Sequence, residues 1–369
     1  MDKLARQLFS QRLLSIDMLR GYFLLVIIID HLERWPGFFE LITGEGKLWV
    51  SAAEGFFIIS GLMVGLIRGR KAMDKPLHQV ARSLLKRAGL LYVWGVGISF
   101  AFLALALALN SYGYVPAGYQ NALGDLPGTI FNTLTLQYSY GWTGFLKFYC
   151  VFLAISPLTI WLLRRGFWWP ILAVSIAIWT QGWDNWYLSW QLLFFSGTVV
   201  GYYAPEIVNW WRKLASVTRW SLASSILLLA TATVLVSTFF TFGWEITKQP
   251  GAVMPFDTFA SIKAQLDPYF HKTSLPLPRM LLGALWFTAL LLLFVKLEPI
   301  LKRLLGWLLI PFGRASLYVY ITHGFLVFAL DILIPDKTLL WLNVVAVSAT
   351  IFIVWLLVKR RFLFSVIPR

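Results

Sequence analysis

The sequence has little of what a water-soluble protein needs. Only 13% of its 369 residues are charged and 59% are hydrophobic, whereas a soluble domain usually has about 25% charged residues. The single cysteine, Cys150, excludes an intrachain disulfide and a cysteine-based metal site. The motifs of zinc proteases, P-loop ATPases and G-x-S-x-G hydrolases are also absent. We therefore expect a protein solvated by lipid, with no metal site and no permanently bound cofactor.

Acidic residues are scarce too, since 17 Asp and Glu stand against 32 Lys and Arg, which gives a formal net charge of +15. Such a charge would suit a nucleic-acid-binding protein if the basic residues formed one soluble face. Here they lie between apolar segments. The expected partner is the lipid bilayer, and no nucleic acid.

Hydropathy predicts an all-α fold, a polytopic integral membrane helical bundle of about ten transmembrane helices in a single domain, residues 1–369. Each apolar run approaches the length of about 20 residues that crosses a bilayer. The connections 110–144 and 244–278 are polar and are expected outside the bilayer. The predicted spans are residues 18–32, 50–67, 88–109, 145–163, 168–183, 188–204, 221–243, 279–297, 306–331 and 339–358.

The placement of Lys and Arg predicts the orientation, because cytoplasmic loops of membrane proteins carry the excess of basic residues. With the N-terminus and C-terminus both cytoplasmic, 22 of the 32 basic residues fall in cytoplasmic segments and 8 in outer segments and helix ends. The remaining two, Arg20 and Arg314, fall within predicted spans. Nine or eleven helices would break this alternation.

The first predicted span contains Asp17, Arg20, Asp30 and His31, although an ionisable group at bilayer depth costs about 2.5–3.5 kcal/mol. Arg20 and His31 are eleven residues apart, so they share a helix face and lie about 16 Å apart along its axis. These groups have a simpler interpretation as interfacial or snorkelling side chains, above all for Asp17.

The second predicted span places Glu54 at a depth similar to that of His31. Asp30 or Glu54 would accept the imidazole N–H and leave the other nitrogen of His31 as a general base. The predicted catalytic residues are therefore His31, Asp30 and Glu54. The alternative for Glu54 is a structural hydrogen bond to a neighbouring helix. On the same stripe, Gly61 and Gly65 predict close helix packing.

The ninth predicted span contains Arg314, Ser316 and His323 on a segment that otherwise looks apolar. Ser316 and His323 are seven residues apart and share a face. The alternative for His323 is a packing histidine with its hydrogen bonds satisfied.

Four segments resemble the motifs of a known superfamily. Residues 16–21 (IDMLRG), followed by Asp30 and His31, resemble the first-helix signature of membrane-bound acyltransferases, which include the acyltransferase-3 proteins and the OpgC-type proteins of periplasmic glucan modification. Residues 53–61 (AEGFFIISG), 189–197 (SWQLLFFSG) and 313–320 (GRASLYVY) look like later motifs of the OpgC type, in the family's order.

The resemblance implies an enzyme of the bacterial cytoplasmic (inner) membrane that takes a succinyl or acetyl group from cytoplasmic acyl-CoA and places it on an extracytoplasmic glycan. It implies His31 as the functional histidine and Arg20 as the first-helix arginine. We assign donor binding to Arg20, Asp17, Arg314, Ser316 and His323. Seven basic residues of segment 68–87 suit coenzyme A phosphates, with the excess of basic residues in cytoplasmic loops as the alternative explanation. Outer aromatic residues suit stacking on sugars, with an interfacial belt as the alternative: Tyr112, Tyr114, Tyr119, Tyr138, Tyr140 and Trp142.

Two other function classes stay open. Ten helices with buried charges also suit a secondary transporter or a flippase of a glycan or lipid intermediate, although the sequence has no half-to-half symmetry. A non-catalytic sensor or scaffold is the third class. Release of free coenzyme A from acyl-CoA in the presence of a glycan would distinguish an enzyme from a transporter and from a scaffold.

Overall fold

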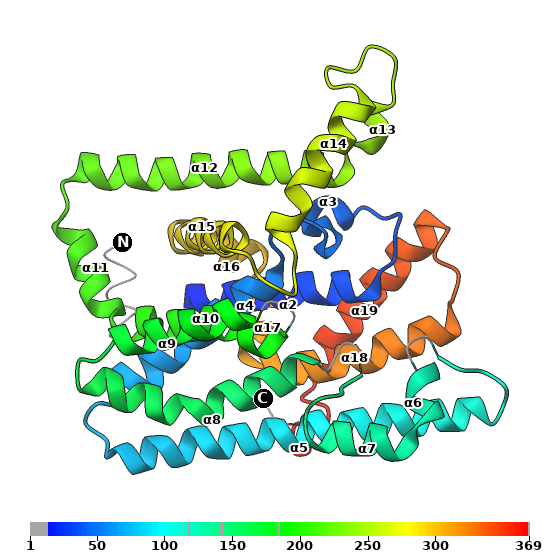
Figure 1. The fold of residues 1–369 in the computed structure, drawn as a ribbon, viewed down its shortest axis with the longest axis horizontal. Helices are drawn as coiled ribbons and strands as arrows, with labels where there is room; N and C mark the ends of the chain where they lie inside the picture. Colours follow the sequence, from blue (N-terminus) through cyan, green and yellow to red (C-terminus); the bar gives the residue numbers. More distant parts are fainter. Residues whose placement is uncertain (1–13, 117–118, 141–143, 183–184, 368–369) are drawn as a thin grey trace. The chain divides into compact units, whose positions relative to one another are not determined.

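The computed structural model describes residues 14–116, 119–140, 144–182 and 185–367, and every regular element within them is helical (Figure 1). The predicted all-helical class is therefore confirmed. The chain forms two compact units. The first comprises Met1–Leu66, Leu172–His323 and Asp336–Arg369, and the second comprises Ile67–Ile171 and Gly324–Pro335.

The first unit contains most of the helices, and three helices run across the division between the units. The crossing helices are η2 (Val64–Arg70), α9 (Trp169–Gln181) and α18 (Ser316–Leu333). The others are α2 (Leu14–Leu32), α3 (Glu40–Thr43), η1 (Gly44–Gly46), α4 (Ala52–Met63), α10 (Trp186–Tyr202), α11 (Ala204–Lys213), α12 (Ser216–Phe242), α13 (Trp244–Thr247), α14 (Phe256–Leu266), η4 (Asp267–Phe270), α15 (Leu277–Lys296), α16 (Glu298–Leu304), α17 (Gly306–Arg314) and α19 (Leu340–Lys359).

The second unit is built on the contact between its two long helices. It contains α5 (Leu77–Asn110), α6 (Gln120–Gly124), α7 (Leu126–Leu134) and α8 (Gly144–Arg164). α5 packs against both α8 and α7. The ring of Phe102 lies 4.9 Å from that of Tyr140, 4.8 Å from Phe325 and 5.1 Å from Phe328, measured between centroids. These rings form an aromatic cluster within the unit, in which Phe102 and Phe328 are buried.

Helices occupy all ten ranges that hydropathy predicts. Among the described residues, seven of these helices are long and apolar enough to cross a membrane: Ala52–Arg70, α5, α8, α12, α15, α18 and α19. The other three are α2, α9 and α10. α9 has 13 residues and α10 has 17, while α2 contains three charged side chains. The all-helical membrane architecture is thus established, and the number ten stays a prediction.

The ninth predicted span is not one helix, which corrects the sequence interpretation of residues 306–331. α17 ends at Arg314, Ala315 leaves the helical region with φ −111° and ψ 39°, and α18 begins at Ser316. Pro311 removes a backbone donor from this stretch and Gly313 lowers its helix propensity. Hydropathy does not detect such a break, because both helices are apolar.

Glycines allow two pairs of helices in the first unit to touch backbone to backbone. A Cβ atom on Gly61 or Gly65 would overlap a carbonyl oxygen of α10, and one on Gly201 would overlap a carbonyl oxygen of α4. The predicted close packing at Gly61 and Gly65 is therefore confirmed. α17 lies equally close to α2, since Gly21 and Gly313 each abut a carbonyl oxygen of the other helix.

Replacement of Gly61 by alanine should destabilise the protein. The added Cβ would collide with the carbonyl oxygen of Phe194, which is backbone and cannot rotate away. We expect a loss of about 1–3 kcal/mol in the free energy of unfolding, as for other overpacked sites. Thermal unfolding in detergent measures this loss.

Gly97→Ala is the matched control, because a Cβ on Gly97 of α5 meets nothing within 4 Å. Alanine also has a higher helix propensity than glycine, so the control should keep or raise the melting temperature. Equal effects of the two substitutions would contradict the close α4–α10 contact.

Candidate active site

α2 carries four of the predicted site residues and is surrounded by other helices. It contacts α4, α15, α17 and α19. Most of its apolar side chains are buried, and Arg20, Asp30 and His31 are half-buried. Charged groups in such a position need partners because burial without one is costly. Each partner therefore indicates what its group does.

His31 lies in direct contact with His323 of α18. Nδ1 of His31 is 2.9 Å from Nε2 of His323, and the two rings are nearly stacked, with centroids 5.1 Å apart. His323 is fully buried. The ring of Tyr320 approaches His323 edge-on, with centroids 5.2 Å apart. The structure thus brings together two histidines that lie 292 residues apart in the sequence.

The hydrogen bonds of the pair assign its tautomers. Nδ1 of His323 lies 3.2 Å from the carbonyl oxygen of Val319. A carbonyl only accepts, so this nitrogen carries the proton and Nε2 of His323 carries a lone pair. Nδ1 of His31 then donates to His323, which leaves the lone pair of His31 on Nε2. This is the form in which an imidazole acts as a base.

The side chain of Asp30 points in a different direction from that of its neighbour His31, because adjacent side chains on a helix are about 100° apart. The Thr43 hydroxyl hydrogen-bonds the carboxylate of Asp30, which also lies beside Gly46. Both partners belong to the short helices that follow α2. The sequence predicts that Asp30 orients His31. The alternative is a structural role, in which Asp30 serves only to bind Thr43.

The predicted donor-binding residues fall into two places. Arg314, at the end of α17, forms an ion pair with Asp17, with 3.5 Å between Nε and Oδ2, and Ser316 begins α18 close by in sequence. Nε of Arg20 is buried and makes no hydrogen bond within the part of the chain that the structure describes. His323, which the sequence groups with these residues, lies against His31 instead.

Glu54 is fully buried and pairs with Arg279 of α15. Nε of Arg279 donates to Oε1 of Glu54 at 2.5 Å, and a second guanidinium nitrogen contacts the same oxygen. Oε2 accepts from the backbone N–H of Ser51 at 3.0 Å and from its hydroxyl at 2.6 Å. Both carboxylate oxygens therefore have partners: one pairs with Arg279 and the other accepts hydrogen bonds from Ser51. Such contacts are what the alternative interpretation of Glu54, a structural hydrogen bond to a neighbouring helix, predicts.

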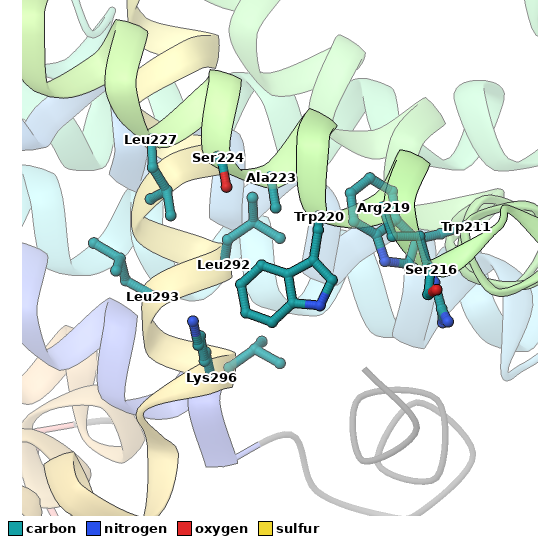
Figure 2. Close-up of a pocket in the computed structure, with 11 residues that line it drawn as sticks. Trp211, Ser216, Arg219, Trp220, Ala223, Ser224, Leu227, Leu292, Leu293 and Lys296 are labelled. Atoms are coloured by element: carbon teal, nitrogen blue, oxygen red, sulfur yellow. The ribbon is translucent and has the colours of Figure 1, made fainter.

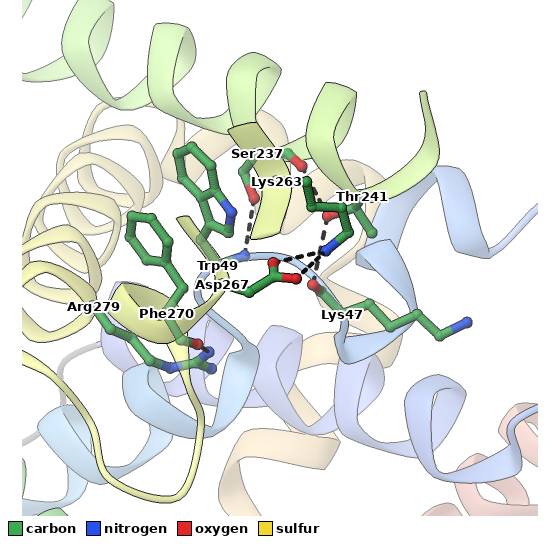
Figure 3. Close-up of polar contacts among 8 residues, drawn as sticks. All are labelled: Lys47, Trp49, Ser237, Thr241, Lys263, Asp267, Phe270 and Arg279. Carbon is green, nitrogen blue, oxygen red and sulfur yellow. Dashed lines mark hydrogen bonds and ion pairs between the residues drawn. The ribbon is translucent and has the colours of Figure 1, made fainter. Parts of the chain in front are cut away.

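Further contacts hold the Arg279 guanidinium in place (Figure 3). Its Nη1 donates to the carbonyl oxygen of Phe270 at 2.6 Å. The Phe270 ring stacks on Trp49, with centroids 4.1 Å apart and planes 3° apart, and the Trp49 backbone N–H donates to the Ser237 hydroxyl at 2.9 Å. These contacts join η4, α12 and the segment before α4 around one buried cation.

Sequence reasoning missed two buried arginines, Arg279 and Arg34. Arg34 is 1% exposed, and its Nη1 donates to the carbonyl oxygen of Asp336 at 3.1 Å. Both arginines lie at predicted outer helix ends, where basic residues are scarce. That departure from the charge bias is a signal that each has a specific partner.

The predicted outer aromatic residues do not form one surface. Tyr119 is fully buried and stacks on Tyr140, with centroids 4.7 Å apart, and burial raises the pKa of the Tyr140 hydroxyl to about 12. Tyr112 and Tyr114 are exposed, Tyr138 is half-buried and Trp142 lies outside the described residues. Tyr119 is thus a core residue of the second unit, and Tyr140 packs against it.

The helical fold, the apolar spans and the paired charges between them define a multi-pass membrane protein. The chain matches the OpgC protein family over residues 12–362 and therefore belongs to that family. No curated protein and no solved structure matches it.

Removal of one partner from the Glu54–Arg279 pair should be strongly destabilising. Arg279→Met leaves the Glu54 carboxylate buried without its cation, which typically costs about 3–5 kcal/mol in the free energy of unfolding. Glu54→Leu should cost a similar amount, and the double variant should recover part of the loss. Thermal and denaturant unfolding of all three proteins in detergent completes this cycle.

The exposed pair Lys263–Asp267 provides the control, with a 2.7 Å contact in the same region (Figure 3). Lys263→Met should cost at most about 1 kcal/mol, because water solvates a surface ion pair. A loss at Arg279 no larger than the loss at Lys263 would contradict the buried bridge.

Proposed function

We propose that this protein transfers an acyl group, succinyl or acetyl, from cytoplasmic acyl-CoA across the membrane to a hydroxyl of an extracytoplasmic glycan, such as a periplasmic glucan. The observation that carries the proposal is the contact of His31 with His323, which leaves a basic imidazole nitrogen among apolar helices. Membership of the OpgC protein family supports the same reaction class.

In this proposal His31 is the general base. Nε2 takes the proton from the acceptor hydroxyl as the hydroxyl oxygen attacks the thioester carbonyl. The new C–O bond forms, the C–S bond breaks, and the coenzyme A thiolate takes the proton back from His31. His323 positions the imidazole, since its Nε2 accepts the Nδ1–H of His31.

Arg20 holds the donor in the same proposal. It lies about three helical turns from His31, about 16 Å along the axis, too far to reach the reacting carbonyl. A guanidinium with a buried, unbonded Nε within the described part of the chain suits a phosphate of acyl-CoA. In the first half of α2, Asp17 forms its ion pair with Arg314 of α17. Arg20 can therefore bind the donor without competition from Asp17.

Ten spans with both termini in the cytoplasm complete the proposal, and contacts within each unit support this topology. In the first unit, Arg34 reaches the backbone of Asp336, and both residues belong to predicted outer segments. In the second unit, Arg164 donates to the carbonyl oxygen of Lys75 at 2.9 Å, and both belong to predicted cytoplasmic segments. Each contact joins segments that the topology places on one side of the membrane.

Cysteine labelling tests the topology. Cys150→Ala gives a cysteine-free background, and single replacements Lys71→Cys and Lys263→Cys are then made in it. An impermeant thiol reagent applied to the outer face of the cytoplasmic membrane should label Lys263→Cys and leave Lys71→Cys unreacted until the membrane is opened. Labelling of both positions, or the opposite pattern, would refute the ten-helix arrangement.

Two substitutions separate the base from the donor-binding residue. His31→Ala should lower turnover roughly 10²–10⁴-fold, the usual effect of removing a general base, while acyl-CoA still binds. Arg20→Ala should weaken acyl-CoA binding. Transfer of a labelled acyl group to envelope glycan measures turnover, and titration of the purified protein measures donor affinity.

His271→Ala is the control, because this histidine is exposed and, among the described residues, hydrogen-bonds to its near neighbour Ser274. It should leave transfer unchanged. Near wild-type transfer by well-folded His31→Ala would eliminate the mechanism. Movement of glycan without release of coenzyme A would favour the transporter class instead.

A further inference from the structure

A pocket of about 300 Å³ lies between α12 and α15, and neither histidine of the pair lines it (Figure 2). The residues that line it come from the first turns of α12, the last turns of α15 and Trp211 of α11. Both α12 and α15 are long and apolar enough to span a bilayer. Helix ends of this kind lie at the membrane surface, where lipid headgroups are.

The charged residues that line this pocket, within the described chain, are both basic: Arg219 and Lys296. The Lys296 ammonium lies 4.6 Å from the centroid of the Trp220 ring, and Figure 2 shows Trp220 between the two cations. The indole N–H of Trp211 is buried and has no acceptor among the described residues. Two cations and an available donor at a membrane surface suit a phosphate group.

The rest of the pocket is apolar and continues along the two helices. Leu227 and Leu293 line both this pocket and a second one of about 330 Å³, which lies between α2, α4, α12 and α15. Ala223 and Leu292 add to the apolar wall. A slot with a cationic end and an apolar length matches an amphiphile with an anionic head and a hydrocarbon chain.

The neighbouring elements face lipid. α11 is amphipathic, with Trp210 exposed on its apolar side and Arg212 and Lys213 in its last turn, a pattern typical of helices that lie in the membrane interface. Most of α12 is also exposed, with Leu228 and Leu235 pointing outward. A lipid from the bilayer therefore has direct access to the slot.

We propose that this pocket binds one anionic phospholipid, with its phosphate at Arg219 and Lys296 and an acyl chain between α12 and α15. Phosphatidylglycerol provides that chemistry. Lipid binding at this place is independent of the acyl transfer proposed above, because none of the residues assigned to that reaction lines the pocket.

Native mass spectrometry of the full-length protein in mixed micelles tests the proposal. The wild-type protein should bind phosphatidylglycerol more tightly than phosphatidylcholine. Arg219→Gln/Lys296→Gln should weaken phosphatidylglycerol binding roughly 25-fold, at about fivefold for each cation near an anionic headgroup, and leave phosphatidylcholine binding unchanged. Lys302→Gln/Arg303→Gln removes the same charge from exposed positions on α16 and should keep the preference.

Ala223→Phe fills the apolar part of the pocket but keeps both cations, so it should weaken binding of both lipids. This variant tests the proposal if Arg219→Gln/Lys296→Gln does not fold. Unchanged phosphatidylglycerol binding in Arg219→Gln/Lys296→Gln would overturn the proposal, as would equal losses in the control on α16. Displacement of phosphatidylglycerol by coenzyme A, which has phosphates but no hydrocarbon chain, would overturn it too and assign the cations to the donor.

Discussion

Inside a bilayer no water solvates a charged or polar side chain, so burial of such a group is costly unless it has a partner. This constraint explains much of the first unit. Glu54 holds Arg279, Asp17 holds Arg314, the Ser15 hydroxyl donates to Glu298 at 2.5 Å, and His31 contacts His323. Each pair joins two helices that are distant in the sequence. Polar contacts therefore select which helices meet, while the apolar surfaces alone would pack in several ways.

Close backbone contact makes one of these pairings possible. α2 meets α17 through Gly21 and Gly313, which brings Asp17 next to the end of α17, where Arg314 lies. α4 meets α10 through glycines in the same manner. In a membrane, helix association depends on such packing because lipid is as apolar as the helices. At the α2–α17 contact the glycines thus set the distance at which Asp17 and Arg314 interact.

The sequence predicts the helical class and the positions of the helices well, because long apolar runs have one stable form in lipid. It also indicates Arg20, Glu54 and His31 as unusual, since charge is rare at that depth. It does not predict partners. Nothing local to His31 points to His323, and nothing local to Glu54 points to Arg279, because helix pairing is a long-range property. The break at Ala315 is missed for another reason: hydropathy averages over the residues that cause it.

The hydrogen-bond chain from His31 through His323 reaches the carbonyl oxygen of Val319. In the Ser-His-Asp triad the chain ends instead on a carboxylate, which stabilises the imidazolium that forms during the reaction. A peptide carbonyl has no formal charge. In the proposed reaction an imidazolium on this pair would therefore be short-lived, and its countercharge would come from the substrates, as the oxyanion of the tetrahedral adduct or the departing thiolate. The pair is thus suited to passing a proton on quickly rather than storing it.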